Sequence, residues 1–137
     1  MTQTPGQEAA ATVPARPTVN TAVLYVCAER GVLTPGLAAE RAEVEGRAYA
    51  AEHRLAILDV LQDEFGEPDP CNRAGWKQVR ELVESGAAAV VIVRWPACIA
   101  PERAHELRYR EIQWVREHGA QVRYSWEPLA KVGGDDA

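Results

Sequence analysis

Three cysteines, Cys27, Cys71 and Cys98, are the residues of this 137-residue sequence best suited to carry chemistry. Thiolates bind zinc, and a set of three would need one further ligand, such as Glu29 or a histidine. Two neighbouring thiols can instead form a redox-sensitive pair. The sequence has no Cys-x-x-Cys or Cys/His spacing typical of a metal site, and free cysteine is often simply a small buried apolar residue. We therefore expect no metal or other cofactor, and a thiol-based metal or redox site is the alternative.

The histidines, His53, His105 and His118, show no arrangement that predicts catalysis. His53 and His118 fall near the C-terminal ends of predicted helices, where a partial positive charge is favourable. A catalytic imidazole needs a nucleophile and an orienting acid, and the sequence offers neither in a known pattern. We expect all three to be structural or solvent-exposed.

Four strand-like segments alternate with three helix-like segments along the chain. Short apolar runs rich in β-branched residues predict strands, and apolar residues at helical spacing predict helices. The predicted strands span 21–27, 55–62, 90–93 and 120–127, and the predicted helices span 37–53, 73–85 and 101–119. Pro101 suits the first position of the third helix, because its missing N–H needs no partner there.

The spacing of apolar residues predicts which side of the first helix faces the core. Val44, Ala48, Ala51 and Leu55 follow one another at helical intervals, as expected for an amphipathic helix packed on a sheet. Asn72 precedes the second helix and is placed to cap it.

Strand–helix alternation with short connections predicts the fold class. It favours an α/β domain of three layers, with a mostly parallel sheet of four to five strands and helices on both faces. We expect one domain over residues 21–129, because the chain is long enough for a single core. The proline-rich segment 1–20 is predicted to be disordered, and 130–137 to be a flexible tail.

Composition narrows the classes of function. The net charge is −5, and the arginines alternate with glutamates, as Glu106 does with Arg110, so DNA binding by this chain alone is not expected. No apolar run is long enough to span a membrane, and the N-terminus lacks the apolar core of a secretory signal, which predicts a cytoplasmic location. A flavodoxin-like domain that binds a small ligand at its strand ends is a further possibility. The first strand is followed only by Gly31 and Gly36, which disfavours a nucleotide ligand.

Four segments, taken in order, resemble the catalytic domain of serine recombinases, the resolvase and invertase family. "AVLYVCAERG" resembles the family's opening strand, which ends in Tyr-x-Arg-x-Ser, and "EGRAYAAEH" resembles its first helix. "DEF…NRAGWKQVRELVESG" resembles its acidic loop and following helix, and "AAVVIVRWPACIAPE" its valine-rich strand before Asp-Arg-Leu-x-Arg. The resemblance covers residues 21–129 and implies a flavodoxin-like winding of the sheet.

Position by position, the resemblance retains the framework and loses the reactive groups. Tyr25 matches the strand tyrosine, while Asp63 and Arg73 match the loop acid and the arginine that begins the next helix. The other matched positions carry different residues: Cys27 stands for the first arginine, Glu29 for the nucleophilic serine, Ala97 and Cys98 for the Asp-Arg pair, and Pro101 for the last arginine.

These replacements imply loss of activity. A serine recombinase forms a covalent phosphoserine link to DNA, for which it needs a hydroxyl and a set of arginines that stabilise charge on the phosphoryl oxygens. Glu29 repels that phosphate, and Cys98 and Pro101 carry no positive charge. We therefore expect a vestigial site, no enzymatic activity, and a role as a protein-interaction or regulatory module.

The partner is expected to be another protein or a second copy of the chain. Trp95, beside the vestigial site, is either an exposed anchor for that partner or part of the core. Tyr109 on the third helix is a second candidate contact. If the resemblance holds, Cys27 and Cys98 meet at this site and Cys71 precedes Arg73, which defines the alternative thiol site.

Overall fold

The computed structural model describes residues 20–29 and 33–130, which form a four-stranded sheet with helices on both faces. The strands are β1 (Thr21–Ala28), β2 (Ala56–Glu64), β3 (Val90–Val93) and β4 (Gln121–Tyr124). The helices are α1 (Leu37–Glu52), α2 (Ala74–Glu84), α3 (His105–Glu117) and α4 (Glu127–Ala130), with short 3₁₀ turns η3 (Pro70–Asn72), η4 (Pro96–Cys98) and η5 (Glu102–Ala104). The predicted order of elements is confirmed.

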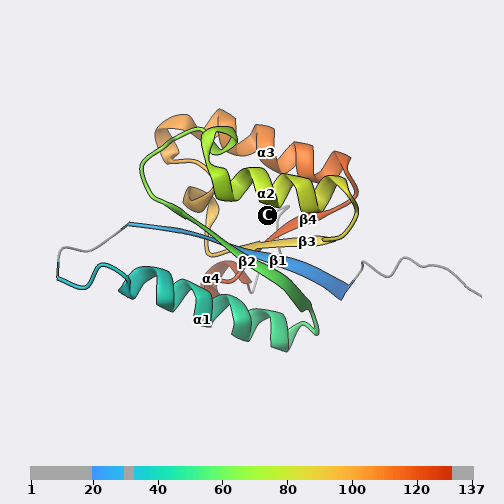
Figure 1. Ribbon diagram of the computed structural model, residues 1–137, viewed down its shortest axis with the longest axis horizontal. Helices are drawn as coiled ribbons and strands as arrows, with labels where there is room; N and C mark the ends of the chain where they lie inside the picture. Colours follow the sequence, from blue (N-terminus) through green and yellow to red (C-terminus); the bar gives the residue numbers. More distant parts are fainter. Residues whose placement is uncertain (1–19, 30–32, 131–137) are drawn as a thin grey trace, which may run out of the picture.

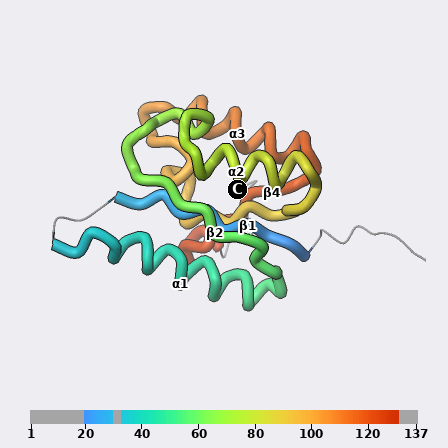
Figure 2. The backbone as a smooth tube through the Cα atoms, viewed as in Figure 1, coloured from blue at the N-terminus to red at the C-terminus, as the bar shows by residue number. Residues whose placement is uncertain are grey.

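The sheet is parallel throughout, with strand order β2-β1-β3-β4. Helices α1 and α4 lie on one face, and α2 and α3 cover the other (Figure 1). The backbone trace shows the same three layers (Figure 2). The predicted three-layer α/β fold class is therefore confirmed. No helix in the described ranges has the length and apolarity that crossing a membrane requires.

Each face of the sheet has its own core. On the α2–α3 side, Trp76 and Val115 are fully buried against the side chains of β1, β3 and β4. On the α1 side, Leu24 and Ile92 pack beneath small helix residues. Gly46 is needed there, because a Cβ at this position would overlap the side chain of Leu24.

The predicted core-facing side of α1 is wrong. Val44 is 69% exposed, and Ala48 and Ala51 also face solvent, while Leu55 lies beyond the helix and is partly buried. The buried side of the helix consists of Ala42, Gly46, Tyr49 and Ala50. Small residues let the helix approach the sheet closely, and this packing outweighs the apolar spacing of the larger side chains.

The predicted cap of α2 is also wrong. Asn72 belongs to η3, and its side chain donates to Glu67 rather than capping the helix. Asp63, at the carboxyl end of β2, accepts hydrogen bonds from the N–H groups of Gly75 (2.8 Å) and Trp76 (2.9 Å). A Cβ on Gly75 would lie 2.7 Å from the Asp63 carboxylate, so glycine permits this approach.

One predicted helix boundary needs correction. The third helix does not begin at Pro101, because η5 forms a separate turn and α3 starts only at His105. At the other end of the described residues, Ala130 ends α4 and packs against the α1-side core. Residues 131–137, and all of the predicted N-terminal segment except Asn20, lie outside the described residues.

Candidate functional site at the carboxyl end of the sheet

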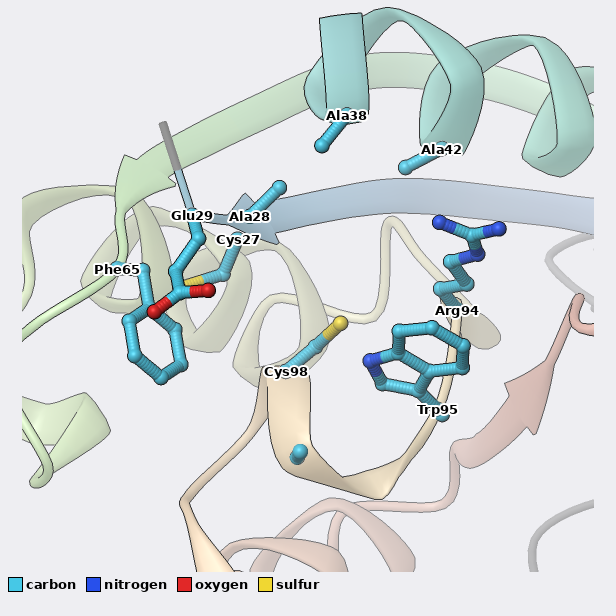
Figure 3. A pocket seen from close by; sticks show the side chains of 10 residues that line it. Cys27, Ala28, Glu29, Ala38, Ala42, Phe65, Arg94, Trp95 and Cys98 are labelled. Atoms are coloured by element: carbon cyan, nitrogen blue, oxygen red, sulfur yellow. The ribbon is translucent and has the colours of Figure 1, made fainter. Parts of the chain in front are cut away.

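A pocket of about 290 Å³ opens where β1 and β3 end. Loops at the carboxyl ends of parallel strands commonly build binding sites, because neighbouring strands open onto the same edge of the sheet. The lining residues come from β1 and the chain after it, from α1, and from the loops that follow β2 and β3 (Figure 3). They are Cys27, Ala28, Glu29, Ala38, Ala42, Phe65, Arg94, Trp95, Ala97 and Cys98.

Two thiols lie in the wall of the pocket. Cys27 and Cys98 are each only 4% exposed, and both lie on the pocket between Glu29 and Trp95 (Figure 3). Burial raises the pKa of both thiols, outweighing the lowering effect of Arg73 on Cys27 and of backbone hydrogen bonds on Cys98. Both sulfurs are therefore neutral at physiological pH, so they supply neither positive charge nor a thiolate nucleophile.

The charged groups of the pocket stand apart. Glu29 is exposed at the end of β1, and Arg94 follows β3 on the opposite side of the pocket (Figure 3). The Nε atom of Arg94 lies 3.0 Å from Glu45 Oε1, and its guanidinium lies 4.5 Å from the centroid of the Trp95 ring. This contact with Glu45 is an ion pair without hydrogen-bond geometry.

Tyr25, Asp63 and Arg73 form a separate buried network beside the pocket. The Tyr25 hydroxyl donates to Asp63 Oδ2 (2.7 Å) and accepts from an Arg73 Nη atom (3.2 Å). Burial holds the pKa of Tyr25 far above its ordinary value, which keeps the phenol protonated for this bond. The same Arg73 nitrogen donates to the carbonyl of Cys98 (2.8 Å), so the network positions the η4 turn.

Of the eight predicted site residues, four line the pocket: Cys27, Glu29, Ala97 and Cys98. Tyr25 and Arg73 lie behind the pocket, and Asp63 caps α2. Pro101 is not among the lining residues, because the chain has already turned toward α3.

The two predicted contact residues differ in exposure. Trp95 is half-buried, lines the pocket and meets Trp126 edge-on at 5.3 Å, so it does not protrude as a free anchor. Tyr109 is 67% exposed on α3, and its ring meets that of His105 edge-on at 6.2 Å.

Solved structures share this architecture. The chain superimposes on the C-terminal catalytic domain of ISC1926 TnpA, an IS607-like serine recombinase, with a TM-score of 0.67 and 18% identity, covering 82% of this chain and 74% of that one. The N-terminal catalytic domain of TP901-1 integrase gives a TM-score of 0.66 at 12% identity, covering 80% and 78%. A resolvase family site-specific recombinase from Streptococcus pneumoniae gives 0.60 at 15% identity, covering 82% and 84%.

The chain has the fold of a serine recombinase catalytic domain. The fold expected from the resemblance is thus confirmed, although identities of 12–18% carry no information about activity. No protein-family profile matches this resolvase-like domain.

One curated protein is similar over part of its sequence. An anthranilate phosphoribosyltransferase from Nocardioides sp. (strain ATCC BAA-499 / JS614) is 39% identical over 83 residues, covering 53% of this chain. The match spans 24% of that enzyme's length.

The structure does not support the alternative of a site built from all three thiols. Cys71 lies in η3, away from the pocket, and donates to Glu111 Oε2 at 3.3 Å. It is separated because η3 packs against α3 rather than against the ends of β1 and β3. Within residues 20–29 and 33–130, no three potential metal ligands of the His, Cys, Asp or Glu type come together.

Glu111 is a buried polar residue that the sequence analysis missed. It is 0% exposed and accepts hydrogen bonds from Trp76 Nε1 (2.7 Å), Arg80 Nε (2.9 Å) and Arg110 Nε (2.7 Å). Burial favours the neutral acid, but these hydrogen bonds outweigh it and lower the pKa of Glu111. The carboxylate joins α2 to α3. Its place four residues before the buried Val115 was the available sequence signal.

Proposed function

We propose that this resolvase-like domain does not cleave DNA and acts as a protein-interaction or regulatory module. The observation that carries the proposal is the pocket itself, where the carboxylate of Glu29 stands beside the neutral thiols of Cys27 and Cys98. The resemblance assigns the nucleophilic serine to position 29. A carboxylate there repels an approaching phosphodiester and offers no hydroxyl for phosphoryl transfer.

The nearby arginines support the same proposal. Arg73 is 5% exposed, and its hydrogen bonds go to Tyr25, Glu67 and Cys98 within the protein. Arg94 borders the pocket, but Glu45 opposes its charge. Loss of one group that stabilises transition-state charge costs roughly 10²–10³-fold in rate, and here several such positions are changed together with the nucleophile.

The partner surface we propose includes Tyr109 on α3. Exposed tyrosines are favourable contacts, because they bury a large rigid ring and keep a hydroxyl for hydrogen bonding. The partner is either a second copy of the chain or another protein. The partial match to a phosphoribosyltransferase covers too little of that enzyme to extend its activity to this chain.

Covalent capture tests the loss of chemistry. The protein is incubated with supercoiled plasmid and with pooled duplex oligonucleotides, quenched in detergent and analysed for protein–DNA adducts, with an active serine recombinase as positive control. We expect no adduct from the wild type or from Glu29→Gln. A phosphoprotein–DNA adduct through any residue of the wild type would overturn the proposal.

Site-specific photocrosslinking tests the interaction. A benzoyl-phenylalanine replaces Tyr109, and the matched control carries it at Glu84, an exposed position at the end of α2. We expect a defined crosslinked protein or homodimer from position 109 only, and Tyr109→Ala should weaken the same association in sedimentation velocity. Equal crosslinking from both positions, or none, would contradict the proposed surface.

A further inference from the structure

The outward side of α1 carries a stripe of residues that is open to solvent. Its members follow one another at alternating intervals of four and three residues and are all exposed, apolar except for one arginine: Leu37, Arg41, Val44, Ala48 and Ala51. The opposite side of the helix consists of small residues and is buried against the sheet. Figure 1 shows α1 as the outermost element on its side of the sheet. The helix therefore has two apolar sides, and the fold uses only one of them.

The spacing of this stripe is that of a contact between two helices. Alternating intervals of three and four residues keep side chains on one line of contact, where each side chain of one helix inserts into a hole between four residues of the other. The structure shows such a hole as a groove of about 300 Å³ on the surface of α1, lined by Leu37, Glu40, Arg41, Val44 and Glu45. Arg41 can lay its aliphatic stem along the contact and keep its guanidinium in water.

We propose that α1 is the self-association surface of this chain and packs antiparallel against α1 of a second copy. In this dimer Val44 of each copy inserts into the groove of the other and lies opposite Arg41. Leu37 of each copy lies opposite Ala48 of the other. The contact is the same for both copies, as a twofold axis requires. It covers Val44, which is 69% exposed in the single chain.

Charges on one flank of the stripe favour the antiparallel direction. Glu40 and Arg47 are both exposed there, seven residues apart. Antiparallel packing places Glu40 of each copy against Arg47 of the other, which gives two ion pairs, whereas parallel packing places Glu40 near Glu45 of the other copy. The Nε atom of Arg47 also contacts Glu43 of its own helix at 2.9 Å. A guanidinium has five N–H donors, so it can serve both carboxylates.

The other flank of the stripe brings no like charges together. Antiparallel packing places Ala38 of one copy opposite Glu45 of the other. Glu45 is engaged within its own copy, where it lies 3.0 Å from Arg94 Nε and accepts a hydrogen bond from the Ser125 hydroxyl at 3.4 Å. Its charge is therefore turned toward the end of the sheet and opposed there.

The inference deepens the proposed function and rests on it, because it assigns one partner of the interaction module to one surface. Helices α1 and α3 lie on opposite faces of the sheet, so Tyr109 stays accessible to a different protein in the dimer (Figure 1). One pair of helices is at the small end of the range for specific interfaces, so we expect a dissociation constant between about 10 and 500 µM.

Sedimentation equilibrium of the full chain, from about 5 to 500 µM, tests the dimer. Val44→Glu places a charge in the contact and should weaken dimerisation by at least about 10-fold. Arg41→Leu makes the stripe continuously apolar and should tighten it by about 5-fold. The matched control is Leu58→Glu, which changes an apolar residue of β2 that is 47% exposed and should leave dimerisation as in the wild type. Urea unfolding followed by circular dichroism verifies that each variant is folded.

Charge reversal tests the antiparallel direction. Glu40→Arg alone, or Arg47→Glu alone, creates two like-charge contacts in its own dimer and should weaken it by about 5- to 20-fold. Mixed in equal amounts, these two variants should associate as tightly as the wild type, because both contacts of the mixed dimer again join an acid and a base. Glu84→Arg, at an exposed position of α2, changes the net charge equally and should have no effect.

The outcomes separate the inference from the proposed function. A chain that stays monomeric at about 500 µM overturns the inference, and so does a dimer weakened by Leu58→Glu and unaffected by Val44→Glu. Charge-reversal variants that fail to associate with each other also overturn it. In each of these cases, covalent capture and crosslinking from position 109 still decide the proposed function. A covalent DNA adduct overturns the proposed function, whatever the variants of α1 do.

Discussion

Two neighbouring regions differ in how their polar groups are bonded. One is the network of Tyr25, Asp63 and Arg73, and the other is the pocket rim formed by Glu29 and Arg94. In the network, each polar group has a hydrogen-bond partner in the protein, at 2.7–3.2 Å. At the rim, Arg94 faces Glu45 in an ion pair without hydrogen-bond geometry and stacks on Trp95, and no hydrogen bond among the described residues reaches Glu29. The network therefore serves the fold, and the rim is free to bind something else.

Removing Arg73 should give the largest effect. Arg73→Ala leaves the carbonyls of Cys98 and Glu67 and the Tyr25 hydroxyl without a donor, so we expect a loss of about 3 kcal/mol in the free energy of unfolding. Urea denaturation followed by circular dichroism measures it. Arg94→Ala, at the rim, should lose about 1 kcal/mol. Equal losses in the two variants would erase the distinction between network and rim.

Truncating Asp63 should come next. Asp63→Ala removes the acceptor of the Gly75 and Trp76 N–H groups, so we expect α2 and the domain to lose about 2 kcal/mol. Asp59→Ala, an exposed position earlier in β2, is the matched control and should change stability by less than about 0.5 kcal/mol. Thermal and urea unfolding of both variants check the difference. If Asp63→Ala is as stable as Asp59→Ala, the hydrogen bonds from Asp63 to the start of α2 do not stabilise the fold.

Acidification should weaken the buried interior by a smaller amount. Because the folded pKa of Glu111 is lowered, its carboxylate stabilises the fold above the ordinary glutamate pKa of about 4.3 and ceases to do so as pH falls below it. We expect the wild type to lose stability below pH 4.3 more steeply than Glu111→Gln, measured by urea unfolding across pH 3–7. Parallel pH profiles would contradict the assigned role.

The smallest effect is expected at the rim. Glu29→Gln removes a charge that no described residue binds, so the free energy of unfolding should change by less than about 0.5 kcal/mol. Glu84→Gln is the matched exposed control. A loss of 2 kcal/mol or more at position 29 would mean that the rim, like the network, supports the fold.

The fold was largely predictable because β1 and β3 are short apolar runs, β4 alternates, and Gly36, Gly86 and Gly119 each mark one end of a main helix. The strand Val90–Val93 is buried on both faces, as its continuous apolar pattern predicts. The resemblance also selected Cys27, Glu29 and Cys98, which the structure places on one pocket. The orientation of α1 was not predictable from spacing, because both of its sides carry alanine and the contact with β1 required Gly46.

Contacts between distant segments decided the rest of the site. Asp63 lies ten residues before Arg73 in the chain, and only the pairing of β1 with β2 brings it beside Tyr25 and the start of α2. Cys71 lies away from Cys27 and Cys98 because the η3 turn that carries it contacts α3. Nothing local distinguishes these positions from ordinary loop residues.

The sequence by itself determined the alternation of strands and helices, and the residue types at the ends of β1 and β3, since local apolar patterns and side-chain chemistry are written in the chain. Tertiary structure alone decided which polar groups are used up inside the protein and which remain open. That outcome depends on the burial and distance of groups far apart in sequence, and it separates Arg73, hydrogen-bonded inside the fold, from Arg94, which borders the pocket and pairs with Glu45.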